Sequence, residues 1–246
     1  MLLFVMSYHT EKERTRFQSI LDHWDDLVEM ERPFQFLFID SLGSPLRTSL
    51  PHHSIPYLDP AGLSRGELIS AEWAYVARYI SEQVDCDCWF WWEGDVLPVR
   101  KDCFEFFMKL WNPERLIMGY HIKDNRWQMR NMINGVAFYA KDFWSFLKPH
   151  FNPAITFDRQ RAFTKKKDGE RFVELNRWYA LCQHEGTLLL TPSLRLVHGI
   201  KDDSLLRQIV EGVETYPLQY DATRAVWCSL KVAAALLLRR NHQPET

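Results

Sequence analysis

Two carboxylate residues stand directly after a very apolar short segment of this 246-residue chain. Residues 88–92, Cys-Trp-Phe-Trp-Trp, predict a buried strand that runs into Glu93-Gly94-Asp95, and Pro98 prevents its simple continuation. In an open α/β sheet, ligands bind beyond the carboxyl ends of the strands. Acids placed there can hold Mg²⁺ or Mn²⁺ together with substrate phosphates. An acidic turn that only ends the strand is the alternative interpretation.

A second polar segment, His198-Gly199-Ile200-Lys201, follows another short apolar run at residues 194–197. The imidazole of His198 can complete a metal site, and the ammonium group of Lys201 can neutralise a phosphate. Gly199 permits a tight turn or a close approach of the backbone. A histidine that is hydrogen-bonded for structural reasons is the alternative interpretation.

The elements that must position these residues begin with a strand–helix–strand pattern. Residues 2–6 predict a buried strand, and Thr10 and Glu13 form a capping box for a helix that reaches about Met30. Residues 34–39 predict the second strand, so the pattern indicates a parallel sheet with a crossover helix. The turn-rich residues 41–65 predict a long loop, and residues 67–83 predict a helix.

The second half of the chain predicts shorter elements. Residues 171–183 form an amphipathic segment. Strands are expected at residues 116–120, 133–139, 188–191 and 194–197, and helices near 104–111, 141–147, 204–213 and 222–240. The chain has no internal repeat and no segment typical of a domain linker. We therefore expect one mixed α/β domain.

Composition excludes several classes of protein. Hydrophobic residues make up 46% of the chain and charged residues 25%, which excludes disorder, collagen and coiled coil as the main class. The formal net charge is −2, so any contact with nucleic acid requires a local basic patch. Aromatic residues reach 14%, which indicates either a heavily aromatic core or surfaces on which flat ligands stack.

Cysteine usage and the apolar segments predict a cellular location. The five cysteines include no Cys-x-x-Cys pair, so free thiols in a reducing compartment are expected rather than disulfides or a zinc ribbon. The apolar start lacks the basic lead of a signal peptide. The apolar run at residues 232–238 is far shorter than the ~20 residues that span a bilayer. We expect a soluble, cytoplasmic protein.

Taken together, these segments resemble the GT-A fold glycosyltransferases, which use a nucleotide-diphosphate sugar. That family carries Asp-x-Asp, or a variant, after a central strand, and many members place a His followed by a Gly and a Lys near the end of the domain. In this chain a glutamate, Glu93, takes the place of the first acid. Residues 132–139, with Asn134-Gly135, are similar to a strand of small phage and bacterial members, and residues 155–158 to their Phe-Asp segment. The resemblance covers residues 1–212.

The resemblance implies a Rossmann-like single domain with a mixed central sheet. Residues 1–98 would bind the nucleotide and residues 99–212 the acceptor, followed by a helical tail at 213–246. It implies a Mn²⁺ or Mg²⁺ ion on Glu93, Asp95 and His198, and a UDP-sugar as donor. If the reaction inverts configuration, Asp158 would take the proton of the acceptor hydroxyl; the alternative is that Asp158 forms a helix cap or a loop ion pair. The other residues that would contact substrate are Ser7, Tyr8, Asp40, Arg65, Glu93, Asn134, Gly135 and Lys201.

Two basic stretches of the sequence indicate which kind of acceptor substrate the protein uses. One contains Lys123, Arg126 and Arg130 around Trp127, and the other contains Lys165-Lys166-Lys167. Basic residues interleaved with aromatic ones suit phosphate contact and base stacking. Similar phage enzymes glycosylate hydroxymethylated DNA bases, so the expected acceptor is a 5-hydroxymethylpyrimidine that is flipped out of the duplex. Solvated loops, with a glycan or protein hydroxyl as acceptor, are the alternative.

Two other classes of protein stay open. Gly62-Leu63-Ser64-Arg65-Gly66 matches the nucleophile elbow of α/β-hydrolases, and Ser64, Asp158 and His198 follow the chain order of their triad. That elbow requires a strand directly before the serine, whereas the preceding residues predict a loop. The third class is a nucleotide-sugar-binding protein without catalytic activity, in which the apolar tail would mediate contacts.

Overall fold

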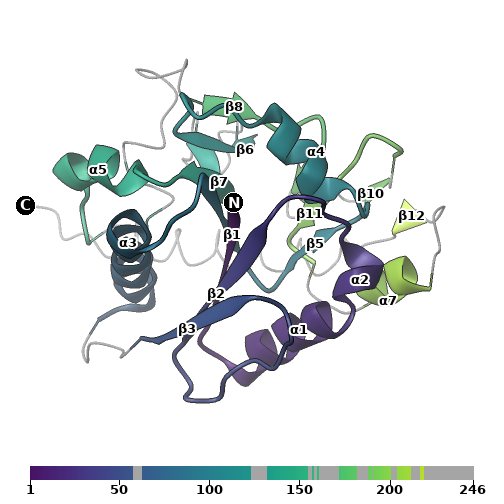
Figure 1. The fold of residues 1–246 in the computed structure, drawn as a ribbon, viewed down its shortest axis with the longest axis horizontal. Helices are drawn as coiled ribbons and strands as arrows, with labels where there is room; N and C mark the ends of the chain where they lie inside the picture. Colours follow the sequence, from purple (N-terminus) through teal and green to yellow (C-terminus); the bar gives the residue numbers. More distant parts are fainter. Residues whose placement is uncertain are drawn as a thin grey trace, which may run out of the picture.

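The centre of the molecule is a mixed seven-stranded sheet with the strand order β3-β2-β1-β4-β7-β6-β8 (Figure 1). The computed structural model describes residues 1–57, 63–122, 132–154, 157, 160, 172–181, 188–189, 191–200, 204–211 and 217–218. The strands of the central sheet are β1 (Leu2–Tyr8), β2 (Phe34–Asp40), β3 (His52–Pro56), β4 (Cys88–Trp92), β6 (Ile117–Ile122), β7 (Met132–Ala140) and β8 (Phe172–Glu174).

Strand direction brings several strand ends to one edge of this sheet. β1 pairs in parallel with β2 and β4, and β2 pairs in parallel with β3. β7 runs antiparallel to both β4 and β6, so β6 has the same direction as β4. The carboxyl ends of β1, β2, β4 and β6 therefore lie at the same edge, which is where ligands bind in sheets of this kind.

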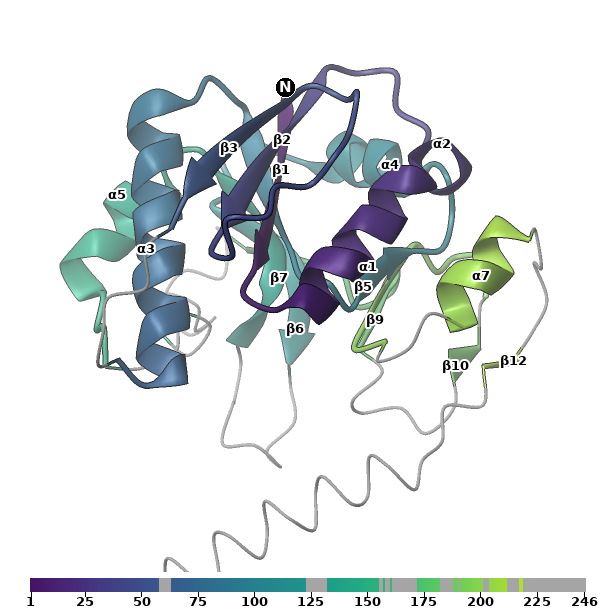
Figure 2. The same ribbon diagram turned by 90° about the horizontal axis from the view of Figure 1, so that it is seen from below.

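Helices cover both faces of the sheet (Figure 2). One face carries α1 (Glu11–Asp22), α2 (Trp24–Leu27) and α4 (Cys103–Leu110), and the other carries α3 (Arg65–Gln83) and α5 (Phe143–Leu147), which a 3-10 turn at Lys148–His150 follows. Because side chains alternate along a strand, Phe4 and Met6 of β1 pack in the first core while Leu3 and Val5 pack in the second. This arrangement confirms the predicted α/β class.

Aromatic side chains fill both cores. Trp73, Trp89 and Trp92 are fully buried. The rings of Phe4 and Phe104 meet edge to face with centroids 4.7 Å apart, and such ring pairs add stability beyond the area they bury. In the described part of the chain, the high aromatic content therefore reflects the core rather than an exposed stacking surface.

Two smaller sheets complete the described part of the molecule. β5 (Val96–Pro98) pairs antiparallel with β11 (Leu196–His198), which pairs in parallel with β9 (Tyr179–Leu181). β10 (Leu188–Leu189) pairs with β12 (Pro217–Leu218), and α7 covers Ser204–Val210. The first of these small sheets matters for function, because β5 directly follows the acidic turn after β4.

The capping box is confirmed, but the first helix is shorter than predicted. The hydroxyl of Thr10 accepts from the backbone N–H of Glu13 at 3.2 Å, and the Glu13 carboxylate accepts from the N–H of Thr10 at 3.1 Å. The chain leaves α1 at Asp22, forms the single turn α2 and becomes extended at Val28. This redirection places the Trp24 ring 5.4 Å from that of Phe4.

Two further predictions need correction. The predicted loop at residues 41–65 contains β3, an edge strand whose exposed polar side chains hide its strand character and whose Pro56 is tolerated at an edge. The amphipathic segment at residues 171–183 contains the short strands β8 and β9, because its apolar residues pack in two different sheets. The predicted helix at residues 222–240 lies outside the described residues.

The described cysteines are buried free thiols. Burial raises the pKa of Cys86 to about 12 and also raises the pKa values of Cys88 and Cys103. Cys182 and Cys228 lie outside the described residues. Among the helices that the structure describes, none combines the length and the apolar character that crossing a membrane requires.

Candidate active site

The acidic segment after β4 forms a tight turn at the carboxyl edge of the central sheet. The N–H of Val96 donates to the carbonyl of Glu93 at 3.0 Å, and the indole N–H of Trp92 donates to the carbonyl of Val96 at 2.9 Å. Both bonds close the turn on itself, so Glu93 and Asp95 leave the backbone from a restrained loop. The prediction that these two acids directly follow a buried strand is confirmed.

Strand β11 brings His198 to the same turn from more than one hundred positions away. His198 lies opposite Val96 in the antiparallel pair of β11 and β5. The N–H groups of Gly199 and Ile200 both donate to the carbonyl of Asp95 at 3.0 Å. Gly199 has φ +93°, a backbone conformation that favours glycine and that lets the chain turn over Asp95.

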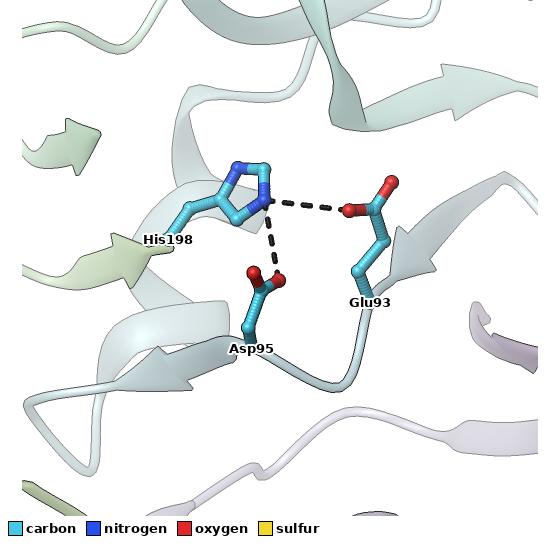
Figure 3. A group of neighbouring side chains, drawn as sticks. All are labelled: Glu93, Asp95 and His198. Carbon is cyan, nitrogen blue, oxygen red and sulfur yellow. Dashed lines mark ion pairs between the residues drawn. The ribbon is translucent and has the colours of Figure 1, made fainter. Parts of the chain in front are cut away.

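Glu93, Asp95 and His198 converge as a group of possible metal ligands (Figure 3). The Nε2 atom of His198 lies 3.3 Å from Asp95 Oδ1 and 3.4 Å from Glu93 Oε2. The imidazole side chain is 6% exposed, Asp95 13% and Glu93 41%. Two carboxylates and one imidazole form a mixed oxygen and nitrogen donor set, which suits Mn²⁺ better than Mg²⁺, because Mg²⁺ prefers oxygen ligands alone. The residues therefore fit a divalent cation.

The electrostatics of His198 follow from its two acidic neighbours. Burial disfavours the charged imidazole and by itself lowers the pKa. The hydrogen bonds to Asp95 and Glu93 and their negative charges outweigh this effect and raise the pKa of His198 to about 9. Two acids arranged around one imidazole thus form a site that attracts positive charge, either a proton or a cation.

A cleft of about 430 Å³ lies beside the acidic turn. Its walls include Ser7 and His9 at the end of β1, Glu72 of α3, Trp91 of β4 and the turn itself. A second, larger depression of about 930 Å³ lies between α1 and α7 and contains none of the three candidate metal ligands. Clefts of a few hundred cubic ångströms accommodate small ligands, so the smaller one is the candidate substrate site.

A buried carboxylate that the sequence analysis missed forms part of the cleft wall. Glu72 is 1% exposed, and its two oxygens accept from the Ser7 hydroxyl at 2.6 Å and pair with His9 Nε2 at 2.7 Å. A signal was present in the sequence, because Glu72 interrupts an apolar stripe at i, i+4 spacing that contains Leu68, Val76 and Ile80. Ser7, which is predicted to contact substrate, also lines the cleft, and its hydroxyl is held by the hydrogen bond to Glu72.

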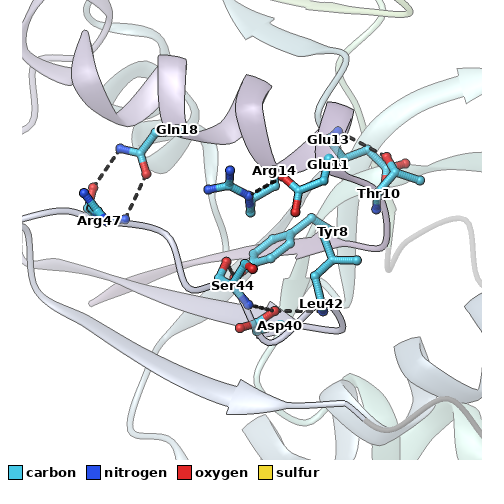
Figure 4. A network of polar contacts seen from close by, with 10 residues as sticks. All are labelled: Tyr8, Thr10, Glu11, Glu13, Arg14, Gln18, Asp40, Leu42, Ser44 and Arg47. Atoms are coloured by element: carbon cyan, nitrogen blue, oxygen red, sulfur yellow. Dashed lines mark hydrogen bonds and ion pairs between the residues drawn. The ribbon is translucent and has the colours of Figure 1, made fainter.

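Tyr8 and Asp40 have structural partners within the fold (Figure 4). Tyr8 is fully buried, and its hydroxyl donates to the carbonyl of Ser44 at 3.4 Å. Asp40 Oδ1 accepts from the N–H groups of Leu42 at 2.9 Å and Ser44 at 3.3 Å, so it shapes the turn after β2. Burial, and then the charge of Asp40, raises the pKa of Tyr8 to about 12. Their predicted contact with base and ribose stays a prediction.

Asn134 and Gly135 lie on β7, in the central sheet. The side-chain oxygen of Asn134 accepts from the N–H of Val136 at 3.0 Å, and the carbonyl of Gly135 accepts from the Tyr139 hydroxyl. Arg65 begins α3, but its side chain is outside the described part of the chain. Outside the described residues lie Asp158, Lys201, Lys123, Arg126, Arg130, Lys165, Lys166 and Lys167, so their roles stay predictions.

Ser64, the candidate nucleophile of the hydrolase alternative, is a helix cap. Its hydroxyl accepts from the N–H of Glu67 at 3.4 Å, and the Glu67 carboxylate accepts from the N–H of Ser64 at 2.9 Å. Leu63, directly before it, is in no strand. A nucleophile elbow instead places its serine immediately after a strand. The local structure therefore accounts for this serine without a catalytic role.

Comparison with solved structures identifies the type of fold. No family model matches the chain, and no curated protein matches it. The galactosyltransferase LgtC, in complex with donor and acceptor sugar analogues, is similar in structure, with a TM-score of 0.52, 10% identity and coverage of 90% of this chain and 99% of that chain. Mouse xyloside xylosyltransferase 1 is also similar, with a TM-score of 0.50, 10% identity and coverage of 80% and 96%. The chain has the GT-A fold.

Proposed function

We propose that this protein is a metal-dependent glycosyltransferase that moves a sugar from a nucleotide-diphosphate sugar, a UDP-sugar, to an acceptor hydroxyl. One observation carries the proposal: Glu93, Asp95 and His198 converge beside a cleft at the carboxyl edge of a GT-A sheet. LgtC, which has the same fold, was crystallised with donor and acceptor sugar analogues, and this supports a sugar donor for the present chain.

In the proposed reaction, the acceptor oxygen forms a bond to the anomeric carbon while the bond between that carbon and a diphosphate oxygen breaks. A bound Mn²⁺ or Mg²⁺ ion would offset the charge that develops on the leaving diphosphate. Glu93, Asp95 and His198 would hold the ion, and Lys201 and Arg65 would contact the diphosphate. If the reaction inverts configuration, the Asp158 carboxylate would take the proton of the acceptor hydroxyl.

Thermal unfolding with UDP and Mn²⁺ tests the donor site. A ligand that binds only the native state raises Tm, so we expect a clear increase when UDP and Mn²⁺ are added together. The Asp95→Asn variant should lose the part of the increase that depends on Mn²⁺. Glu114→Gln, which changes an exposed acid in a turn, is the matched control. An unchanged increase in Asp95→Asn would contradict the proposed site.

For the acceptor we propose a 5-hydroxymethylpyrimidine in DNA. The proposal rests on two basic stretches, residues 123–130, whose basic residues flank Trp127 in the sequence, and Lys165-Lys166-Lys167. Basic residues beside an aromatic one suit phosphate contact with base stacking. Mass spectrometry of hydroxymethylated and unmodified DNA after incubation with UDP-sugars and Mn²⁺ tests it. Transfer only to hydroxymethylated DNA is expected. Transfer to glycans or proteins instead would reassign the acceptor, and donor binding without any transfer would indicate a non-catalytic protein.

A further inference from the structure

A buried polar chain links the candidate metal ligand His198 to the central sheet. The hydroxyl of Tyr179 lies 3.1 Å from His198 Nδ1 and 3.4 Å from the side-chain oxygen of Asn134. Tyr179 is 1% exposed and His198 4%. The three residues come from β9, β11 and β7, so the chain joins the small sheet to the central one.

The hydrogen-bond directions in this chain can be worked out from Asn134. The oxygen of its amide group accepts a hydrogen bond from the N–H of Val136 at 3.0 Å, and this contact fixes the orientation of the amide. An amide oxygen can only accept hydrogen bonds, so any hydroxyl that contacts it must be the donor. The Tyr179 hydroxyl therefore donates its hydrogen to Asn134. The oxygen of the same hydroxyl is then the acceptor for His198 Nδ1, so Nδ1 carries a hydrogen and Nε2 faces the two carboxylates.

We infer that Tyr179 is a positioning residue that orients His198 for a divalent cation. A histidine ligand commonly donates its second ring N–H to an oxygen atom, and that contact selects the tautomer and the ring orientation. Tyr179 supplies this oxygen. The inference rests on the proposed function, because it assigns a supporting role at the proposed metal site, and it also reassigns Asn134 from substrate contact to support of Tyr179.

The tyrosine ring is itself held in place. Its centroid lies 5.5 Å from that of Tyr120 in an edge-to-face pair, and β9 pairs in parallel with β11, with Leu181 opposite His198. A phenylalanine would keep this packing and would lose only the hydroxyl. The substitution Tyr179→Phe therefore separates the hydrogen bond to His198 from the packing of the ring.

Manganese binding to the protein alone, measured by electron paramagnetic resonance, tests the inference. Loss of a group that orients a metal ligand typically weakens metal affinity about 10–100-fold, and we expect this for Tyr179→Phe. Tyr139→Phe is the matched control, because Tyr139 is also fully buried but its hydroxyl bonds to the carbonyl of Gly135. Tyr139→Phe should bind Mn²⁺ like the natural protein.

A second readout distinguishes positioning from a structural role. In the metal-free protein, NMR should show the Nδ1–H hydrogen of His198 at the chemical shift of a hydrogen-bonded group, and Tyr179→Phe should change that shift while Tm in EDTA stays close to that of Tyr139→Phe. Equal Mn²⁺ affinity in Tyr179→Phe and the natural protein would overturn this inference alone. A natural protein that binds no Mn²⁺ would overturn both the inference and the proposed metal site.

Discussion

The backbone N–H of Gly199 donates a 3.0 Å hydrogen bond to the carbonyl of Asp95. This bond connects the main chains of the two segments that carry the candidate metal ligands, so the position of His198 relative to Asp95 does not depend on side-chain contacts alone. The ligands are thereby brought together before any cation binds. Such preorganisation lowers the cost of ordering a site on binding.

The left-handed conformation of Gly199 predicts a specific effect of Gly199→Ala. A side chain at φ +93° is strained, and the substitution should lower the free energy of unfolding by about 1–2 kcal/mol. It should also weaken Mn²⁺ binding, because the turn over Asp95 shifts. Gly43→Ala is the control, since Gly43 has φ +66° and nothing lies within 4 Å of an added Cβ. Urea unfolding and Mn²⁺ titration of both variants check this; an equal Mn²⁺ affinity in the two would contradict it.

The different exposure of the two acids predicts unequal effects of their amide variants. Asp95 is 13% exposed and Glu93 is 41% exposed, so Asp95 is the more enclosed ligand. We expect Asp95→Asn to weaken Mn²⁺ binding by more than about 100-fold and Glu93→Gln by about 10-fold, each 10-fold step corresponding to about 1.4 kcal/mol. Calorimetric titration with Mn²⁺ measures both affinities. A larger loss of Mn²⁺ affinity in Glu93→Gln than in Asp95→Asn would show that Glu93, and not Asp95, is the more important ligand.

The buried carboxylate of Glu72 predicts a loss of stability on Glu72→Gln. The amide keeps the shape but has only one acceptor oxygen, so one of the two hydrogen bonds that link the half-buried Ser7 and His9 to the buried carboxylate is lost. That loss costs about 1–3 kcal/mol of unfolding free energy. Glu82→Gln, at an exposed position of the same helix, should change stability little. Urea unfolding of the two variants distinguishes them, and equal stabilities would show that the Glu72 network contributes nothing.

The acidic half of the candidate site could be predicted from the sequence because its signals are local. A run of apolar residues at 88–92 indicates a buried strand, and Glu93 and Asp95 must then lie at its carboxyl end. The same reasoning failed for β3, whose side chains are mostly exposed. An edge strand is stabilised mainly by backbone pairing with its one neighbour, and that pairing leaves no pattern in the side chains.

The partners of His198 could not be predicted from spacing. Its position opposite Val96 depends on the pairing of β11 with β5, two strands about one hundred residues apart. Tyr179 lies within the segment at residues 171–183 that the sequence predicts to be amphipathic, and nothing local indicates that its hydroxyl bonds to a histidine. The resemblance to GT-A enzymes predicts that His198 is a metal ligand. The pairing of β11 with β5 is what places His198 beside Glu93 and Asp95.

The pKa of His198 predicts how the stability of the metal-free protein depends on pH. The value rises from 6.5 to about 9 on folding, so the folded protein binds this proton more tightly than the unfolded chain does. The resulting stabilisation is complete below about pH 6.5 and is lost as the pH rises through about 9. From the size of the shift, the loss is roughly 3 kcal/mol for this group. Urea unfolding in EDTA between pH 6 and pH 10 measures the slope, and His198→Asn should remove this part of it. A natural protein whose stability stays constant across this range would show that His198 does not pair with Glu93 and Asp95 in solution.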